Sequence, residues 1–151
     1  MLTKTLVGFA ASALLTTAAL AQAPQFGTAA DAKAMLEKVV SAVKADKTKA
    51  LDQFNKGEGG FKDRDLYPFC GNAGDGAMTA HPSAAVRAMK LQDIKDKDGK
   101  ALGEEMLKVA KEGTVAEVTY KWPRPGSEAP VDKVTFVTKV ADQVCGVGYY
   151  K

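Results

Sequence analysis

Residues 114–122 read Thr-Val-Ala-Glu-Val-Thr-Tyr-Lys-Trp, and this stretch decides the fold class. Polar and apolar side chains alternate along it, which is typical of a β-strand with one buried face. After a proline-containing segment over 123–130, residues 131–140 and 144–150 supply two further runs rich in β-branched and aromatic side chains. Three such runs joined by short connections predict an antiparallel sheet in this part of the chain.

A hairpin is predicted further upstream. Residues 65–70 and 77–81 have the composition of strands, and the glycine-rich residues 71–76 between them have that of a turn. Pro68 lies inside the first of these strands and has no N–H to donate to a neighbouring strand. We therefore expect Pro68 at a sheet edge or at a bulge. Residues 103–111 predict a short helix.

The N-terminal part of the domain has the pattern of a long amphipathic helix. Thr28 and Asp31 have the spacing of a capping box, and apolar residues then recur every three or four positions over 29–45. Asp46 is suited to cap a second helical segment, which ends at Gly57. The order of elements is a helix, two strands, small helices and then three strands, which predicts an antiparallel α+β fold.

The first 21 residues have the features of a secretory signal peptide. Lys4 is the only charged residue in 1–30, residues 6–20 are almost wholly apolar or small, and Ala19-Leu20-Ala21 fits a cleavage site. We expect cleavage after Ala21, which leaves residues 22–151 as a single periplasmic or secreted domain. No later stretch is long and apolar enough to span a membrane, so we expect no span in the mature chain.

Composition argues against several classes of function. The sequence has 21 basic and 18 acidic residues. Removal of Lys4 with the signal peptide leaves a basic excess of only two, so we expect no nucleic-acid partner. One His and two Cys offer no recognised metal or haem motif and no nucleophile–base signature, so we expect no cofactor, no metal and no enzymatic activity. Residues 96–99 look like part of a calcium loop, but the first ligand position would be Ile94, which favours a solvated turn.

One cluster of aromatic and cationic residues stands out. It contains His81, Tyr120, Trp122 and Lys133. Tyr120 and Trp122 are two residues apart in a predicted strand, so their side chains should project from the same face of the sheet. These residues could line a pocket, or the aromatic residues could be ordinary core and Lys133 could lie on a solvated edge.

Several motifs, in the same order along the chain, resemble those of single Cache sensor domains. In the first half the similar segments are Asp75-Gly76, Ala80-His81-Pro82 and residues 95–100, which read Lys-Asp-Lys-Asp-Gly-Lys. In the second half they are residues 118–125 (Val-Thr-Tyr-Lys-Trp-Pro-Arg-Pro), 133–137 (Lys-Val-Thr-Phe-Val) and 147–150 (Val-Gly-Tyr-Tyr). The resemblance covers nearly all of residues 22–151.

The resemblance implies a long N-terminal helix packed on a PAS-like antiparallel sheet of about five strands, with a small-molecule pocket between the sheet and the loops over it. Members of the family bind small ligands outside the cytoplasm, often carboxylates, usually as input modules of chemoreceptors and kinases. Carried over to this sequence, the ligand-binding positions are His81, Tyr120, Trp122 and Lys133, with Tyr67 and Met78 lining the pocket. A buried ammonium and a His or Tyr donor are suited to hold a carboxylate.

The resemblance also carries expectations about partners and cysteines. No output domain follows residue 151 in this sequence, so we expect a membrane receptor or kinase as partner. The alternative is a structural or interaction protein whose pocket is filled by side chains. The implied topology sets the first strand beside the last, which would allow Cys70 and Cys145 to form a disulfide in an oxidising compartment. Two buried free thiols remain the other possibility.

Overall fold

The computed structural model describes residues 24–151, so the predicted signal peptide lies outside the described residues. The helices, in chain order, are α1 (Ala29–Ala45), α2 (Lys47–Lys56), α3 (Ala84–Arg87), the 3₁₀ helix η1 (Leu91–Asp93) and α4 (Leu102–Val109). The strands are β1 (Pro68–Asn72), β2 (Met78–Ala80), β3 (Ala116–Pro123), β4 (Pro130–Val140) and β5 (Gln143–Tyr150).

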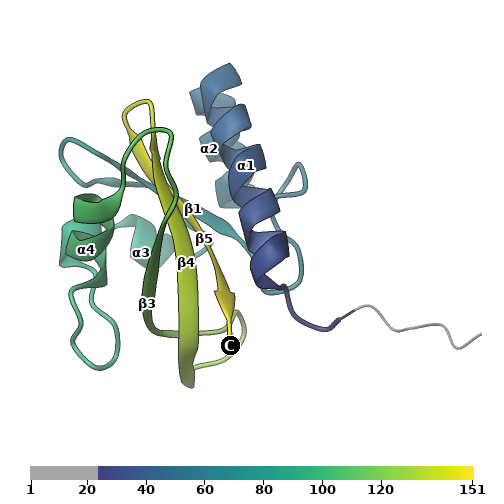
Figure 1. Cartoon of the computed structure of the whole chain (residues 1–151), viewed down its shortest axis with the longest axis vertical. Helices are drawn as coiled ribbons and strands as arrows, with labels where there is room; N and C mark the ends of the chain where they lie inside the picture. Colours follow the sequence, from purple (N-terminus) through teal and green to yellow (C-terminus); the bar gives the residue numbers. More distant parts are fainter. Residues whose placement is uncertain (1–23) are drawn as a thin grey trace, which may run out of the picture.

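The five strands form one antiparallel sheet in the order β2-β1-β5-β4-β3. Figure 1 shows α1 and α2 on one side of this sheet and α3 and α4 on the other. The first strand, β1, therefore lies beside the last, β5. The predicted α+β fold, with a long N-terminal helix on a five-stranded antiparallel sheet, is confirmed.

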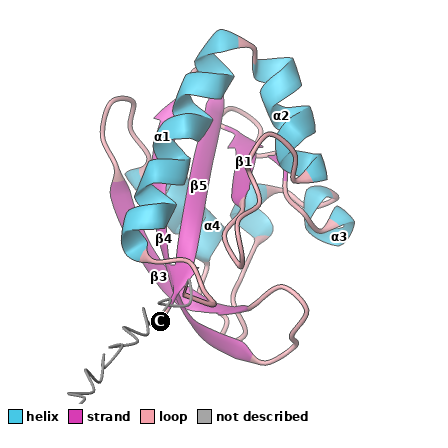
Figure 2. Cartoon of the chain, turned by 90° about the vertical axis from the view of Figure 1, so that its right-hand side faces the viewer, coloured by secondary structure: helices cyan, strands magenta, loops and turns pink. Residues whose placement is uncertain are grey.

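The two N-terminal helices begin and end where the sequence predicts. The Thr28 hydroxyl accepts from the Asp31 backbone N–H, and the Asp31 carboxylate accepts from the Thr28 N–H, which completes the capping box. Asp46 caps α2, and Gly57 ends it in the left-handed conformation. Figure 2 shows α1 lying along β5. Its buried face consists of Ala32, Met35, Leu36, Val39 and Val43.

Because side chains alternate along a strand, the strands contribute side chains to two cores, one on each face of the sheet. Cys70, Phe136 and Val147 belong to the core beneath α1 and α2. Phe69 and Val137 belong to the core on the other face, together with side chains from η1 and α4. The second core surrounds the candidate site described below.

The prediction for Pro68 is wrong in detail. The strand starts at Pro68 and not at residue 65, and β1 is an internal strand, paired on both sides. Pro68 is its first residue, and β2 pairs only with Cys70 and Gly71, where the bulge occurs. A proline is tolerated as the first residue of a strand, because the pairing on one side has not yet begun.

Close approach of η1 and α4 depends on a glycine. A Cβ atom at Gly103 would lie 1.6 Å from the carbonyl oxygen of Leu91, a backbone atom that no side-chain rotation can move aside. The sequence predicts a helix over 103–111, and the structure starts α4 one residue earlier, which places Gly103 within its first turn.

We expect Gly103→Ala to lower the free energy of unfolding by about 1–3 kcal/mol, because the added methyl group forces η1 and α4 apart. Denaturant unfolding measures this loss. Gly74→Ala is the matched control, because Gly74 is exposed and a Cβ atom there comes no closer than 3.2 Å to its nearest neighbour. Equal stability of the two variants would contradict the role given to Gly103.

Candidate ligand-binding site

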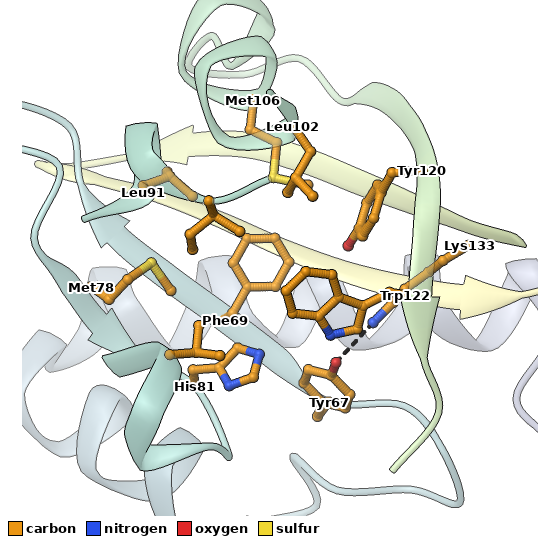
Figure 3. Close-up of a pocket in the computed structure, with 12 residues that line it drawn as sticks. Tyr67, Phe69, Met78, His81, Leu91, Leu102, Met106, Tyr120, Trp122 and Lys133 are labelled. Atoms are coloured by element: carbon orange, nitrogen blue, oxygen red, sulfur yellow. Dashed lines mark hydrogen bonds between the residues drawn. The ribbon is translucent and has the colours of Figure 1, made fainter. Parts of the chain in front are cut away.

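A small cavity lies between the sheet and the η1–α4 segment, on the face away from α1 (Figure 3). Its volume is about 20 Å³, which is room for about one water molecule. The lining residues are contributed by all parts of this face: Tyr67, Phe69, Met78, His81, Val86, Leu91, Ile94, Leu102, Met106, Tyr120, Trp122 and Lys133.

Among the described residues, Lys133 on β4 is the only cationic side chain of this lining, and it is 1% exposed. Its Nζ donates to the hydroxyl of Tyr67 at 3.0 Å and to the hydroxyl of Tyr150 at 3.3 Å. The ammonium also lies over both rings, 4.3 Å from the centroid of Tyr67 and 4.6 Å from that of Tyr150. Burial lowers the pKa of Lys133 to about 7, against a smaller opposing effect of the Asp65 carboxylate.

Tyr150 fixes one side of this arrangement. Its hydroxyl donates to the carbonyl oxygen of Pro123 at 2.8 Å, so towards Lys133 it acts as an acceptor. The hydroxyl of Tyr67 also accepts from Lys133, and it interacts with the polar groups of Tyr150 and Trp122. Burial raises the pKa of both phenols, so both are neutral at physiological pH.

His81 follows β2 and is held by contacts from three segments. Its backbone N–H donates to Asn55 of α2 at 3.1 Å, and Arg87 donates to its carbonyl oxygen. The backbone N–H of Ser83 donates to Nδ1 at 2.9 Å, which assigns the imidazole proton to Nε2. Burial and the nearby Lys133 charge lower the pKa of His81 to about 4. His81 is therefore a neutral Nε2–H donor at pH 7.

Tyr120 and Trp122 extend from β3 into the cavity wall, as their spacing predicts. Their rings meet edge to face, with centroids 6.1 Å apart. The hydroxyl of Tyr120 shares a 2.8 Å hydrogen bond with that of Thr135 on β4. Tyr120 is buried, whereas Trp122 is half-buried and forms part of the outer wall.

The structure brings together all six residues named by the sequence: Tyr67, Met78, His81, Tyr120, Trp122 and Lys133. Their role in ligand binding stays a prediction. Sequence reasoning missed Tyr150 as a partner of Lys133, and it missed the apolar residues of the wall. Phe69 could have been found, since it lies two residues after Tyr67 and therefore on the same face. Leu91, Ile94, Leu102 and Met106 carried no comparable signal, because only tertiary packing brings η1 and α4 to the sheet.

A second hollow lies outside this cavity. It has a volume of about 270 Å³ and shares Tyr67, His81, Val86 and Trp122 with the cavity. Its outer end is formed by two short segments, Pro82–Ser83 and Pro123–Pro125. The four shared side chains therefore separate the cavity from this hollow. Val86 and Trp122 are half-buried, whereas Tyr67 and His81 are buried.

No group of three or more His, Cys, Asp or Glu side chains comes together as a metal site within residues 24–151. In the segment that looked like a calcium loop, Asp96 uses both carboxylate oxygens on backbone groups. One oxygen accepts from the N–H groups of Asp98 and Lys100, and the other from that of Lys121 on β3. These bonds hold the turn against the sheet edge. Over the same residues, no helix is long and apolar enough to cross a membrane.

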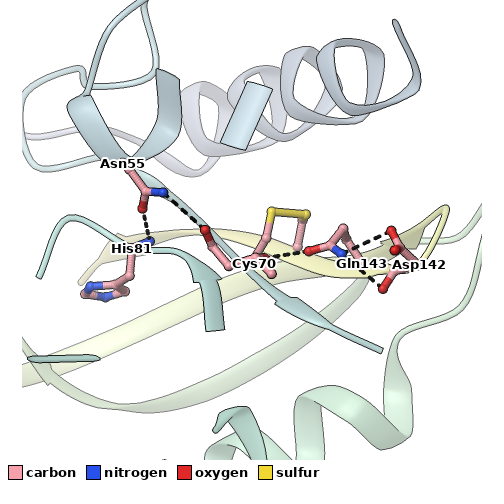
Figure 4. The surroundings of a disulfide bond; sticks show 7 residues. Asn55, Cys70, His81, Asp142 and Gln143 are labelled. Atoms are coloured by element: carbon pink, nitrogen blue, oxygen red, sulfur yellow. Dashed lines mark hydrogen bonds between the residues drawn. A yellow bond between two sulfur atoms is a disulfide. The ribbon is translucent and has the colours of Figure 1, made fainter. Parts of the chain in front are cut away.

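Figure 4 shows the disulfide between Cys70 and Cys145, on the opposite face of the sheet from the cavity. The two cysteines are direct partners in the register of β1 and β5. The pairing implied by the family topology is therefore present in the structure.

Comparison with known families identifies this arrangement. The family model described as single Cache domain 2 matches residues 5–150. The chain belongs to this family. The match begins inside the predicted signal peptide, and the cleavage site itself stays a prediction. Among characterised proteins, the methyl-accepting chemotaxis protein McpP of Pseudomonas putida is 32% identical over 91 residues, which are 58% of this chain and 16% of the receptor.

Solved structures share the fold of this Cache domain. A methyl-accepting chemotaxis protein from Vibrio parahaemolyticus superposes with a TM-score of 0.65 at 22% identity, covering 80% of this chain and 86% of that one. A Cache chemosensory domain described in terms of carboxylic acid recognition gives a TM-score of 0.59 at 24% identity, covering 78% and 84%. A periplasmic sensor domain of a chemotaxis protein gives the same TM-score and identity, covering 78% and 86%.

Proposed function

We propose that this Cache domain is an exported, non-enzymatic sensor module that binds a short monocarboxylate in the cavity beside Lys133. The observation that carries the proposal is a buried ammonium whose hydrogen-bond partners are two neutral phenols. A buried cation without an anion is unfavourable, and a carboxylate ligand would supply the missing charge. The description of one structural neighbour as recognising carboxylic acids supports the same ligand class.

The side chains that line the cavity narrow the class of ligand further. Lys133 offers one positive charge, and His81 and Tyr67 offer neutral donors, which together suit one carboxylate group. No acidic side chain of residues 24–151 belongs to the lining of this cavity, so nothing in this part of the chain would pair there with the ammonium group of an amino acid. The remaining wall is apolar and suits a short aliphatic tail. A second carboxylate would have to be buried without a cation.

A ligand of this size does not fit the cavity as it stands. Room for about one water molecule means that the wall formed by Val86 and Trp122 must move outward when the ligand enters. The same small volume favours the alternative function, a structural or interaction protein whose pocket is filled by its own side chains. Binding experiments separate the two functions.

We expect propionate and its close homologues to raise the melting temperature, whereas succinate, alanine and propylamine should have little effect. A ligand at 100 times its dissociation constant adds about 2.7 kcal/mol of stability, which corresponds to roughly 5–10 °C for a domain of this size. Trp122 is the only tryptophan in the chain, so its fluorescence gives a second reading from the cavity wall. The absence of any shift across the panel would favour the filled-pocket alternative.

Export and partnership belong to the same proposal. The predicted cleavage after Ala21 would place the domain outside the cytoplasm, and one structural neighbour is described as a periplasmic sensor domain. There it would act through a membrane receptor or kinase as partner. The intact mass of the protein recovered from the periplasmic fraction tests the cleavage, which should remove residues 1–21.

A further inference from the structure

The charge on Lys133 is poorly balanced within the described part of the chain. Its Nζ has two hydrogen-bond acceptors, and both are neutral hydroxyl groups. The nearest acidic influence comes from Asp65, whose oxygens are engaged elsewhere. One accepts from the backbone N–H of Gly27 at 2.7 Å, and the other faces Nε of Arg124 at 3.4 Å.

The other titratable groups around Lys133 add no negative charge. Tyr67, Tyr150 and Tyr120 face it from β1's leading segment, β5 and β3, and burial raises the pKa of each phenol. His81 is neutral above about pH 5, because its pKa is lowered to about 4. Arg124, whose guanidinium lies 5.1 Å from the centroid of the Tyr150 ring, adds a positive charge. The side chains that η1 and α4 contribute to the lining are apolar.

We propose that a carboxylate enters this site together with a proton, so that the domain responds to carboxylate and proton concentration jointly. The proton comes from solvent and is held on Nζ of Lys133, which pairs as an ammonium with the bound carboxylate. This inference rests on the proposed function and adds that ligand binding is regulated by the proton concentration. Without the ligand, the ammonium is buried among neutral groups, and with the ligand it gains an anion in a low-dielectric site.

Binding a carboxylate plus a proton is thermodynamically equivalent to binding the undissociated acid. Below about pH 7 Lys133 is already protonated, and affinity should not depend on pH. Above about pH 7 the empty site loses its proton, and the apparent dissociation constant should rise by about tenfold per pH unit. The domain would therefore bind a weak acid most tightly at neutral or acidic pH.

Isothermal titration calorimetry with propionate tests this coupling directly. Repeating the titration in buffers with different heats of ionisation gives the number of protons taken up. We expect nearly one proton at pH 8.5, about half at pH 7 and almost none at pH 6. Between pH 8 and pH 9 the dissociation constant should rise about tenfold, in a range where propionate itself stays ionised.

Two substitutions on β4 sharpen the test. Lys133→Arg places a permanently charged group at the site, so any binding it retains should take up no proton and should be independent of pH between 6 and 9. Lys139→Met is the matched control, because Lys139 lies on the same strand outside this cavity and should leave the proton uptake unchanged. Loss of the proton uptake in Lys139→Met would overturn the assignment to Lys133.

The outcomes distinguish this inference from the proposed function. Binding without proton uptake at every pH would overturn the coupling and leave carboxylate binding intact. No binding of propionate at any pH would overturn both. If Lys133→Arg does not fold, nuclear magnetic resonance of ¹³C-labelled lysine side chains reads the group directly, with assignment by the signal lost in Lys133→Met. A midpoint near pH 7 supports the coupling, and a midpoint above pH 9 overturns it.

Discussion

Lys133→Met is expected to weaken propionate binding by about 1.5–3 kcal/mol, the range for a hydrogen bond to a charged group. This corresponds to about a 10- to 150-fold rise in the dissociation constant. Lys139→Met on the same strand should bind propionate as the unaltered protein does. Calorimetry or Trp122 fluorescence measures both variants. Unchanged affinity in Lys133→Met would contradict the carboxylate proposal and favour a neutral ligand or an amine held by the aromatic residues.

The same substitution is expected to stabilise the fold while it impairs binding. Methionine fills a similar volume without a buried charge, and replacement of buried charged groups by apolar ones of similar volume is often neutral or stabilising, by up to about 4 kcal/mol. Both the Tyr67 and the Tyr150 hydroxyl lose Lys133 as a donor, but Tyr150 keeps its own hydrogen bond to the Pro123 carbonyl oxygen. If Lys133→Met binds propionate more weakly and is also more stable to unfolding, Lys133 serves ligand binding and not folding.

The stability gain should depend on pH. In the folded domain the pKa of Lys133 is lowered to about 7, whereas an unfolded lysine has a pKa of about 10.4. Below pH 7 both states carry the charge, and the folded state bears the full cost of burying it. Between about pH 7 and pH 10 the unfolded state binds more protons, so the unaltered protein gains stability as pH rises. The advantage of Lys133→Met should be largest below pH 7 and should shrink towards pH 10.

Loss of the disulfide is expected to be the largest stability effect of a single substitution in this domain. Cys70 and Cys145 are separated by 75 residues in sequence, and for a loop of that size the chain-entropy model gives about 4 kcal/mol. Both positions are fully buried in the core beneath α1 and α2. We expect Cys70→Ser to lower the melting temperature by about 10 °C, since each kcal/mol is worth about 2–4 °C at this size.

Two controls separate the bond from the change of side chain. In Cys70→Ser, reducing agent should have no further effect, whereas in the unaltered protein it should lower the melting temperature by a comparable amount. Mass spectrometry of unfolded, non-reduced protein should show no alkylated thiol. Two alkylated cysteines would show that the bond is absent. Propionate binding at a temperature where the variant is folded should persist, because the disulfide lies on the other face of the sheet (Figure 4).

Local sequence signals accounted for most of the elements. The capping residues Thr28, Asp31 and Asp46 set the helix starts, because a side-chain acceptor must satisfy the free N–H groups there, and Gly57 set an end. The alternation in 114–122 predicted strand β3 and placed Tyr120 and Trp122 on one face. These signals work because each depends only on atoms a few residues apart.

The family resemblance contributed what local patterns do not carry. It implied that the first strand lies beside the last, and this neighbourhood is what allows Cys70 to meet Cys145. It also gave Lys133 a ligand-binding role, which the aromatic and cationic cluster by itself had left open. By composition alone, Lys133 suited a solvated edge of the sheet as well as it suited a pocket. Nothing in the neighbouring sequence shows that β4 is covered on both faces.

Sequence alone determined that this protein has a long capped helix followed by antiparallel strands, and that an aromatic and cationic cluster accompanies them. Only the tertiary structure decided that Tyr150 accepts from Lys133, that η1 and α4 approach closely at Gly103, and that no carboxylate of residues 24–151 accepts a hydrogen bond from the buried ammonium. These features depend on contacts between residues that are not neighbours in sequence, such as Leu91 with Gly103 and Lys133 with Tyr150, and on exclusion of water from all sides. Burial is a property of the whole packed domain, and it is burial that turns an ordinary lysine into one with a pKa near 7.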